Sequence, residues 1–189
     1  MNRPLVLASA SPRRVQLLRE AGHAFDVLVP QGVEEAHDPA LTPEALTVEN
    51  ARRTAVAAAA RRPDALVLGA DTLVYVDGIP LGKPADLEEA AAMLRRLSGR
   101  AHEVCTGVFL AWDGGRAGRG FHVVTEVMFK TLSDEDIAAY HARVDPLDKA
   151  GAYGIQEHGD RIIAGHEGSW TNVMGLPMER VLEELQGKG

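Results

Sequence analysis

Apolar residues recur in short runs along the chain, and small or polar residues bound each run. Residues 5–7 and 25–29 form two short runs, and residues 65–76 form a longer one that is interrupted only near its middle, by Asp71 and Thr72. Runs of this kind are typical of buried strands. The pattern therefore predicts three strands in the first 76 residues.

Between these strands the sequence carries helix signals. Ser11-Pro12 and Thr42-Pro43 each combine a residue that caps free amides with a proline that fits the first helical position. The first predicted helix ends near Gly22, a good left-handed cap, and the second is Ala-rich and runs to about residue 61. Further helices are predicted at residues 86–99, where Asp86 and Glu89 form a capping box, at 133–143 and at 177–186.

The middle of the chain is dominated by hairpins. Asp77-Gly78 predicts a tight turn, and two long strands at 104–112 and 121–132 are joined by a Gly-rich turn. Residues 161–164 are interpreted as another strand, and 145–156 and 168–176 as loops. This mixture predicts an α/β protein with a mixed sheet rather than a doubly wound parallel one. No linker divides the chain, so residues 1–189 are interpreted as one domain.

Composition narrows the function. The net charge of −7 argues against general binding to the nucleic-acid backbone, although an anionic substrate can still bind at a local basic cluster. No run is long enough to cross a membrane and the N-terminus lacks a signal pattern, so no membrane partner is expected. With Cys105 as the one cysteine, no internal disulfide forms, and a reducing cytoplasm is the expected location.

The stretch from Ser9 to Arg14 has two readings. A strand that runs straight into a helix N-terminus places free amides and the helix dipole where they favour an anion. Arg13 and Arg14 oppose that dipole, which makes sense if they reach a bound phosphate. The alternative is a capped surface helix with two solvated arginines.

Asp71 is the most informative single residue. A carboxylate inside an apolar strand is costly unless it is paired or bound to metal, although it can also satisfy nearby amides at a strand end. Glu34 and Glu35 lie in a polar loop and offer a second carboxylate for magnesium or manganese. Each of them can equally be a solvated loop charge.

Other candidates are dispersed. Lys83 stands in a short rigid Gly-Lys-Pro loop, and Lys149 precedes a small-residue stretch that lets a ligand approach the backbone. The histidines show no metal-ligand spacing and are interpreted as structural or exposed. No Walker glycine loop, GxSxG elbow or dinucleotide GxGxxG is found. Dispersed cations with two acidic groups suit phosphate chemistry.

Taken together, these segments resemble the Maf family of nucleoside triphosphate pyrophosphatases. The matching pieces follow one another in family order and span almost the whole chain: SASPRR (9–14), VEE (33–35), GADT (69–72), GKP (82–84), LSG (97–99), DPLDKAGAYGIQ (145–156) and GSWTNVMGLP (168–177). Each is weak alone, and the set is specific. The resemblance implies an elongated mixed β-sheet flanked by helices, with two lobes and a cleft, as in inosine triphosphate pyrophosphatase-like proteins.

The resemblance also implies an activity: hydrolysis of a nucleoside triphosphate to the monophosphate and pyrophosphate, with a divalent metal (Mg²⁺ or Mn²⁺). Asp71 matches the family's proton acceptor for water, and Glu35 its metal-associated residue, so both are expected metal ligands. The catalytic set implied is Asp71, Glu35 and Lys83. The substrate-binding set implied is Ser9, Arg13, Arg14, Thr72, Lys149 and Gln156, with Arg13, Thr72 and Gln156 linked to base choice.

The ending AlaTyrGlyIleGln resembles the branch that acts on dTTP and UTP. One position departs from the family: Thr54 stands where a lysine is frequent, and neither Arg52 nor Arg53 points the same way on a helix. The implied role is cleaning of the nucleotide pool, and a homodimer is compatible with the sequence. The alternative is a nucleotide-binding regulator of cell division or septum formation.

Overall fold

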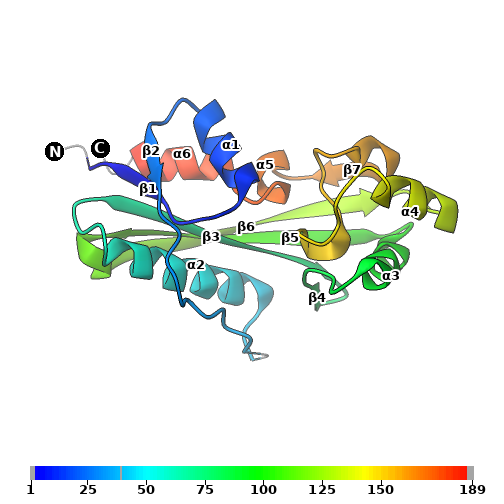
Figure 1. Ribbon diagram of the computed structural model, residues 1–189, viewed down its shortest axis with the longest axis horizontal. Helices are drawn as coiled ribbons and strands as arrows, with labels where there is room; N and C mark the ends of the chain where they lie inside the picture. The colour runs from blue at the N-terminus through cyan, green and yellow to red at the C-terminus, as the bar shows by residue number, and fades with distance from the viewer. Residues whose placement is uncertain (1–2, 39, 187–189) are drawn as a thin grey trace. The chain divides into compact units, whose positions relative to one another are not determined.

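The computed structural model describes residues 3–38 and 40–186. Its seven strands form one mixed sheet in the order β2-β1-β3-β5-β6-β7, with β4 paired to β3 off this path (Figure 1). Strand β1 (Leu5–Leu7) is parallel to β2 (Phe25–Val27) and to β3 (Leu66–Val76), whereas β4 (Ile79–Leu81) is antiparallel to β3. The predicted α/β class with a mixed sheet is confirmed.

The chain divides into two compact units. The first comprises residues 1–72, 106–123 and 175–189, and the second comprises 73–105 and 124–174. Strands β3, β5 (Ala101–Trp112) and β6 (Ala117–Phe129) contribute residues to both. Two units agree with the two lobes that the family resemblance implies. The interpretation of residues 1–189 as one domain stays a prediction.

In the first unit, helix α2 (Pro43–Ala59) lies on one side of the strands, and α1 (Pro12–Glu20) and α6 (Met178–Gln186) lie on the other (Figure 1). Small residues allow α2 to pack closely on the sheet. The core between them includes Val6, Ala55, Ala58, Ala59, Val67 and Ala111. A short 3-10 helix, Asp113–Gly115, connects β5 to β6.

The second unit has larger core residues. Its helices are α3 (Leu87–Leu97), α4 (Asp134–His141) and α5 (Trp170–Val173), and its last strand is β7 (Ile163–Glu167), antiparallel to β6. Two 3-10 helices, Ala150–Ala152 and Gly159–Arg161, lie between α4 and β7. The core includes Val74, Leu94, Leu97, Val127, Phe129, Tyr140, Tyr153 and Ile162.

The helix starts are largely as predicted, but two caps differ. Thr42 accepts a hydrogen bond from the amide of Ala45 (3.3 Å), and Ser133 forms a full capping box. Ser11, by contrast, makes no side-chain cap. At residue 86 the predicted capping box is only half formed: Asp86 caps the amide of Glu89, but the Glu89 carboxylate accepts from Ala85 rather than from Asp86.

Two segments were predicted wrongly in part. Residues 168–176 contain the short helix α5 instead of being only a loop, because Ser169 accepts a hydrogen bond from the amide of Asn172 and nucleates a turn. The last strand lies at 163–167 and extends beyond the predicted 161–164, whose first part is a 3-10 turn. These are boundary errors of the usual kind.

Two glycines bring α2 into direct contact with the sheet. A Cβ on Gly69 would lie 2.5 Å from the carbonyl oxygen of Ala51, and one on Gly107 would lie 2.3 Å from backbone atoms of Thr47 and Val48. Real Cβ atoms do not approach other atoms so closely, so only glycine permits this helix position. The helix therefore lies close enough for its polar side chains to reach β3.

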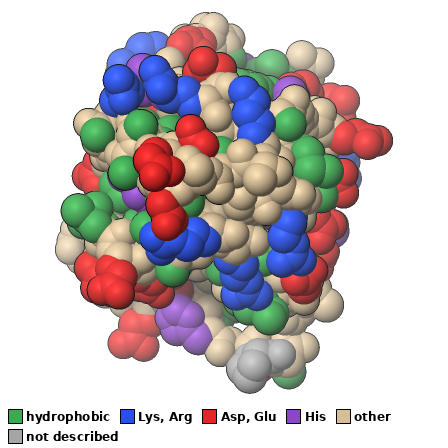
Figure 2. Space-filling view, turned by 90° about the vertical axis from the view of Figure 1, so that its right-hand side faces the viewer, with side chains coloured by type: hydrophobic (Ala, Val, Ile, Leu, Met, Phe, Trp, Pro, Cys, Tyr) green, Lys and Arg blue, Asp and Glu red, His purple; other side chains and the backbone are tan. Residues whose placement is uncertain are grey.

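The surface agrees with the mixed composition. On the face drawn in Figure 2, acidic and basic side chains are interspersed among apolar ones. Within the described part of the chain, no helix combines the length and the apolar character needed to cross a membrane.

Candidate active site

Asp71 lies in the middle of β3, half-buried, with both carboxylate oxygens hydrogen-bonded. Oδ1 accepts from the amide of Thr72 (2.9 Å), and Oδ2 accepts from Nδ2 of Asn50 (3.0 Å). Because each oxygen accepts from a donor, the two hydrogen bonds hold the carboxylate in one orientation. Each oxygen keeps a further lone pair for a proton, a water or a cation.

Asn50 itself is 6% exposed and uses both ends of its amide. While Nδ2 donates to Asp71, Oδ1 accepts from the backbone amide of Ala36 (2.7 Å). The side chain thus connects β3 to the acidic loop that contains Glu34 and Glu35. We did not predict a role for Asn50 from the sequence; the available signal was a poor helix former inside an Ala-rich helix.

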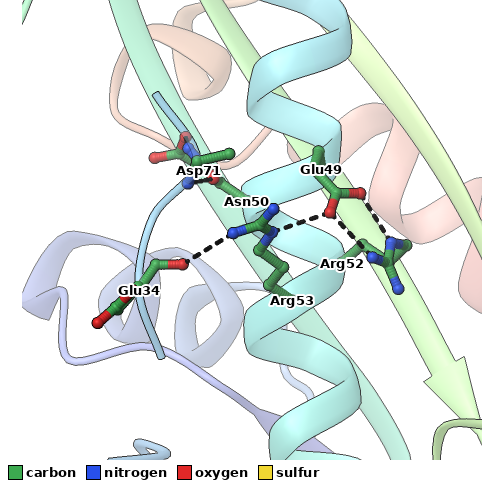
Figure 3. Close-up of polar contacts among 7 residues, drawn as sticks. Glu34, Glu49, Asn50, Arg52, Arg53 and Asp71 are labelled. Atoms are coloured by element: carbon green, nitrogen blue, oxygen red, sulfur yellow. Dashed lines mark hydrogen bonds and ion pairs between the residues drawn. The ribbon is translucent and has the colours of Figure 1, made fainter. Parts of the chain in front are cut away.

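One turn along the same helix, Arg53 also reaches the acidic loop (Figure 3). Its Nη1 donates to the carbonyl oxygen of Glu34 (3.4 Å), and its Nε donates to Glu49 (2.9 Å). Arg52 donates to Glu49 through two nitrogens, at 2.8 and 2.9 Å. Hydrogen bonds from both arginines lower the pKa of Glu49 to about 2. Both cations near Thr54 are therefore bound to a carboxylate of their own helix.

Arg14 is held by the protein itself. Its guanidinium donates to the carbonyl oxygens of Gly175 and Ala70, each at 2.8 Å, and to the hydroxyls of Thr72 (3.0 Å) and Ser9 (3.3 Å). Burial lowers the pKa of Arg14 to about 10, a loss opposed by the negative charges of Asp71 and Glu35, so it stays a cation at neutral pH. Arg14 thereby joins Ser9, the strand residues Ala70 and Thr72, and Gly175.

Several predicted site residues of the first unit surround this guanidinium. Ser9 is buried at 7% exposure and also accepts from the amide of Ser11 (3.2 Å). Thr72 exchanges a hydrogen bond with Thr106 (2.9 Å). The charge of Arg13 lowers the pKa of Arg14, whereas the charges of Asp71 and Glu35 raise it. Arg13, Asp71 and Glu35 therefore each lie within electrostatic reach of Arg14.

Glu35 is exposed, and no hydrogen bond or ion pair joins its side chain to another described residue. Of the two loop glutamates, it is the one whose charge acts on Arg14. The carboxylate of Glu34 points away from Asp71 in Figure 3. The Glu35 carboxylate therefore has no hydrogen-bond partner among the described residues, and its charge acts on the same guanidinium as that of Asp71. It is available to a ligand from solution.

The second unit contains the remaining candidates. Lys83 is exposed, and within the described residues its ammonium has no ion-pair partner. Its loop is tied to the Lys149 segment, because the amide of Gly151 donates to the carbonyl oxygen of Gly82 (3.0 Å). Lys149 itself is 4% exposed. Its Nζ contacts the oxygens of Asp145 (2.8 Å), Asp148 (2.6 Å) and Glu157 (3.2 Å).

Gln156 has an unused acceptor. Its Nε2 donates to Glu157 (3.2 Å), whereas its Oε1 is buried and has no hydrogen-bond partner among the described residues. Buried acceptors without partners are rare in native proteins, because leaving one unpaired costs about 1–3 kcal/mol. A ligand N–H would satisfy this oxygen.

With this geometry in place, comparison with known proteins identifies the family. The model of the family described as Maf-like protein matches residues 4–188. The chain belongs to the Maf family. Among its relatives is a protein of Akkermansia muciniphila named dTTP/UTP pyrophosphatase, 46% identical over 98% of this chain and 97% of its own. A protein of the same name from Escherichia coli O157:H7 is 47% identical, over 96% and 91%.

Structural comparison supports the fold of this Maf protein. The Ham1 protein of Staphylococcus aureus aligns with 99% of this chain and 100% of its own, at a TM-score of 0.55 and 16% identity. At that identity the likeness concerns the fold alone. It agrees with the expected mixed α/β architecture flanked by helices.

The donors available for a metal are few. Within residues 3–38 and 40–186, no three His, Cys, Asp or Glu side chains are grouped to hold an ion. Asp71 and Glu35 are two hard oxygen donors, and Mg²⁺ commonly uses one or two carboxylates together with waters and substrate phosphates. The two carboxylates therefore do not fit an all-protein metal cage, and waters and substrate phosphates would complete the coordination of a cation that they hold.

Proposed function

We propose that this Maf protein hydrolyses dTTP and UTP to the nucleoside monophosphate and pyrophosphate. The observation that carries the proposal is that the charges of two carboxylates, Asp71 and Glu35, act on the half-buried guanidinium of Arg14. Positive charge near the phosphates lowers the free energy of the transition state for attack at phosphorus. A carboxylate beside these cations can act as the general base. The names of relatives at 46–47% identity support the same reaction.

In this proposal Asp71 takes a proton from a water molecule, whose oxygen attacks the α-phosphorus. The bond between the α-phosphorus and the bridging oxygen breaks, and pyrophosphate leaves. Thr72 and Asn50 hold Asp71 by its two oxygens, so the base does not need to reorient. A divalent cation held by Glu35 and Asp71, Mg²⁺ or Mn²⁺, supplies charge neutralisation when bound.

The other predicted residues receive roles in the same reaction. We assign phosphate contacts to Arg13 and Lys83. Ser9, Arg14 and Lys149 hold protein partners, so we assign them to shaping the site, and a phosphate contact by any of the three requires exchange of one partner. Gln156 is assigned to the base, because its unpaired Oε1 complements the ring N–H of thymine or uracil.

The alternative, a nucleotide-binding regulator of division, lacks a matching observation. A protein that only senses an anion gains nothing from two carboxylates beside the anion site, since they repel phosphate. A cytoplasmic location and a homodimer stay expectations.

The test is an assay of pyrophosphate release over a panel of nucleoside triphosphates with Mg²⁺ or Mn²⁺. We expect dTTP and UTP to be the preferred substrates, with monophosphate formed in equal amount. Release of orthophosphate with a diphosphate product would move the attack to the terminal phosphorus and refute the proposal. Binding without turnover would favour the regulator.

A further inference from the structure

The acidic loop is held on both sides of Glu35 by a single helix. On one side the amide of Ala36 donates to Asn50 (2.7 Å), and on the other the carbonyl oxygen of Glu34 accepts from Arg53 (3.4 Å). Glu35 lies between these two anchors and has no described partner of its own. Its backbone is therefore fixed while its carboxylate stays available.

The same helix also fixes the second carboxylate. Asn50 donates to Oδ2 of Asp71 (3.0 Å) with the nitrogen of the amide whose oxygen holds Ala36. Figure 3 shows Asn50 directed from α2 towards Asp71, with Arg53 directed towards the loop. One amide thus sets the position of β3's carboxylate relative to the loop that carries Glu35.

We propose that Asn50 is a positioning residue that holds Asp71 and the Glu35 loop in register as one two-carboxylate cation site, with Arg53 as a weaker second anchor. The effects that we expect on kcat and KM rest on the proposed function, whereas the effect on Mn²⁺ binding does not. The amide serves both contacts because it carries a donor and an acceptor, whereas Leu offers neither group and an ionised Asp offers no donor. The side chain is buried, so water does not readily replace its bonds.

The helix position makes this link possible. Gly69 and Gly107 allow α2 to touch β3 and β5, and a Cβ at either glycine would collide with the helix backbone. Asn50 lies between the two contact points, Thr47 and Ala51. A short side chain such as Asn therefore reaches Asp71 from the helix.

The test uses Mn²⁺ alone as the probe for the cation site. Mn²⁺ binding to the nucleotide-free protein is measured by electron paramagnetic resonance, beside kcat and KM for dTTP and the melting temperature. For Asn50→Leu we expect about tenfold weaker Mn²⁺ binding and a kcat at least about tenfold lower, with KM for dTTP within about twofold. A role confined to folding would lower the melting temperature and leave kcat per folded molecule and Mn²⁺ affinity unchanged, which would overturn the proposal.

Asn50→Asp separates the contact with Ala36 from the contact with Asp71. It also keeps the proposal testable if Asn50→Leu fails to fold. It keeps an acceptor for Ala36 and places a carboxylate against Asp71. We expect Mn²⁺ affinity at least equal to the wild type, because a third carboxylate is added, together with a kcat at least about tenfold lower, because Asp71 is repelled. A wild-type kcat in this variant would contradict the positioning role.

Arg52→Ala is the matched control. Arg52 binds the same Glu49 as Arg53 and is similarly exposed, and its hydrogen bonds to described residues go to Glu49 rather than to the loop. We expect kcat and Mn²⁺ affinity to stay within about twofold of the wild type; losses equal to those of Asn50→Leu would overturn the proposal. The Mn²⁺ measurement needs no turnover, so failure of the proposed reaction is distinguishable from failure of the positioning role.

Discussion

At the scale of single residues, the charged groups of the candidate site differ in their hydrogen-bond partners. Asp71 has a donor on each oxygen, Arg14 has four protein acceptors, and Glu35 has no described partner. These differences separate a carboxylate held on both oxygens, a cation held by protein acceptors and a carboxylate open to solution. Charge type alone, as read from the sequence, does not make this distinction.

Asp71→Asn tests the base. The substitution keeps the size of the side chain and still offers an oxygen to Asn50, while it deletes the negative charge. We expect turnover to fall at least about a hundredfold, the lower range for loss of a general base, with nucleotide affinity kept or increased. Pyrophosphate release, nucleotide affinity and melting temperature are measured on the same preparation. Near-normal turnover in a stable variant would remove Asp71 from this role.

His102 gives a pH prediction that is independent of the reaction. It is 2% exposed, bonded to the Tyr153 hydroxyl through Nε2 (2.7 Å), and its Nδ1 has no partner among the described residues. Burial lowers its pKa from 6.5 to about 4, so the unfolded chain binds the proton more tightly. Stability contributed by neutral His102 is therefore present above about pH 6.5 and lost as the pH falls towards 4.

We expect this loss to be on the order of 3 kcal/mol across that interval. Urea unfolding at several pH values is compared between the wild type and His102→Gln, which keeps a hydrogen-bonding group but does not titrate. The exposed His122, replaced in the same way, is the control. Identical pH slopes for the wild type and His102→Gln would contradict the assignment.

At the scale of elements, α2 links the sheet to the acidic loop, and glycines set its distance. Gly107→Ala places a Cβ 2.3 Å from the backbone of Thr47 and Val48, so the helix must move. We expect a loss of about 2 kcal/mol or more in the free energy of unfolding, measured with urea, and a lower kcat because Asn50 moves with the helix. The control is Gly165→Ala in β7, where a Cβ meets no atom within 4 Å. Equal stability of the two variants would show that α2 tolerates displacement.

Most elements were predictable because their signals are local. Thr42-Pro43 starts α2, Ser133 starts α4 with its capping box, and Asp77-Gly78 turns β3 into β4. The short helix α5 was missed because its signal, Ser169, also fits an ordinary turn. Propensity does not separate these outcomes over four residues.

The candidate site was less predictable, for a physical reason. The resemblance named Asp71, Glu35 and Arg14, but the partners that orient them come from distant parts of the chain. Arg14 binds the carbonyl oxygen of Gly175, and Asn50 lies in a helix whose contact with the sheet depends on glycines elsewhere. Long-range hydrogen bonds of this kind leave no local pattern in the sequence.

At the scale of the whole molecule, the two units carry different kinds of candidate. The first holds Asp71, Glu35 and the arginines, the groups that suit a reaction at phosphorus, whereas the second holds Lys83, Lys149 and Gln156. Family membership over residues 4–188 covers both sets.

The fate of the water oxygen tests the proposed reaction most directly. Wild-type protein is incubated with dTTP in ¹⁸O-labelled water, and the products are separated and weighed by mass spectrometry. Attack at the α-phosphorus, with water activated by Asp71, predicts one ¹⁸O atom in the thymidine monophosphate and none in the pyrophosphate. Label in the pyrophosphate would place the attack on the β-phosphorus and contradict the mechanism derived from Asp71 and Glu35.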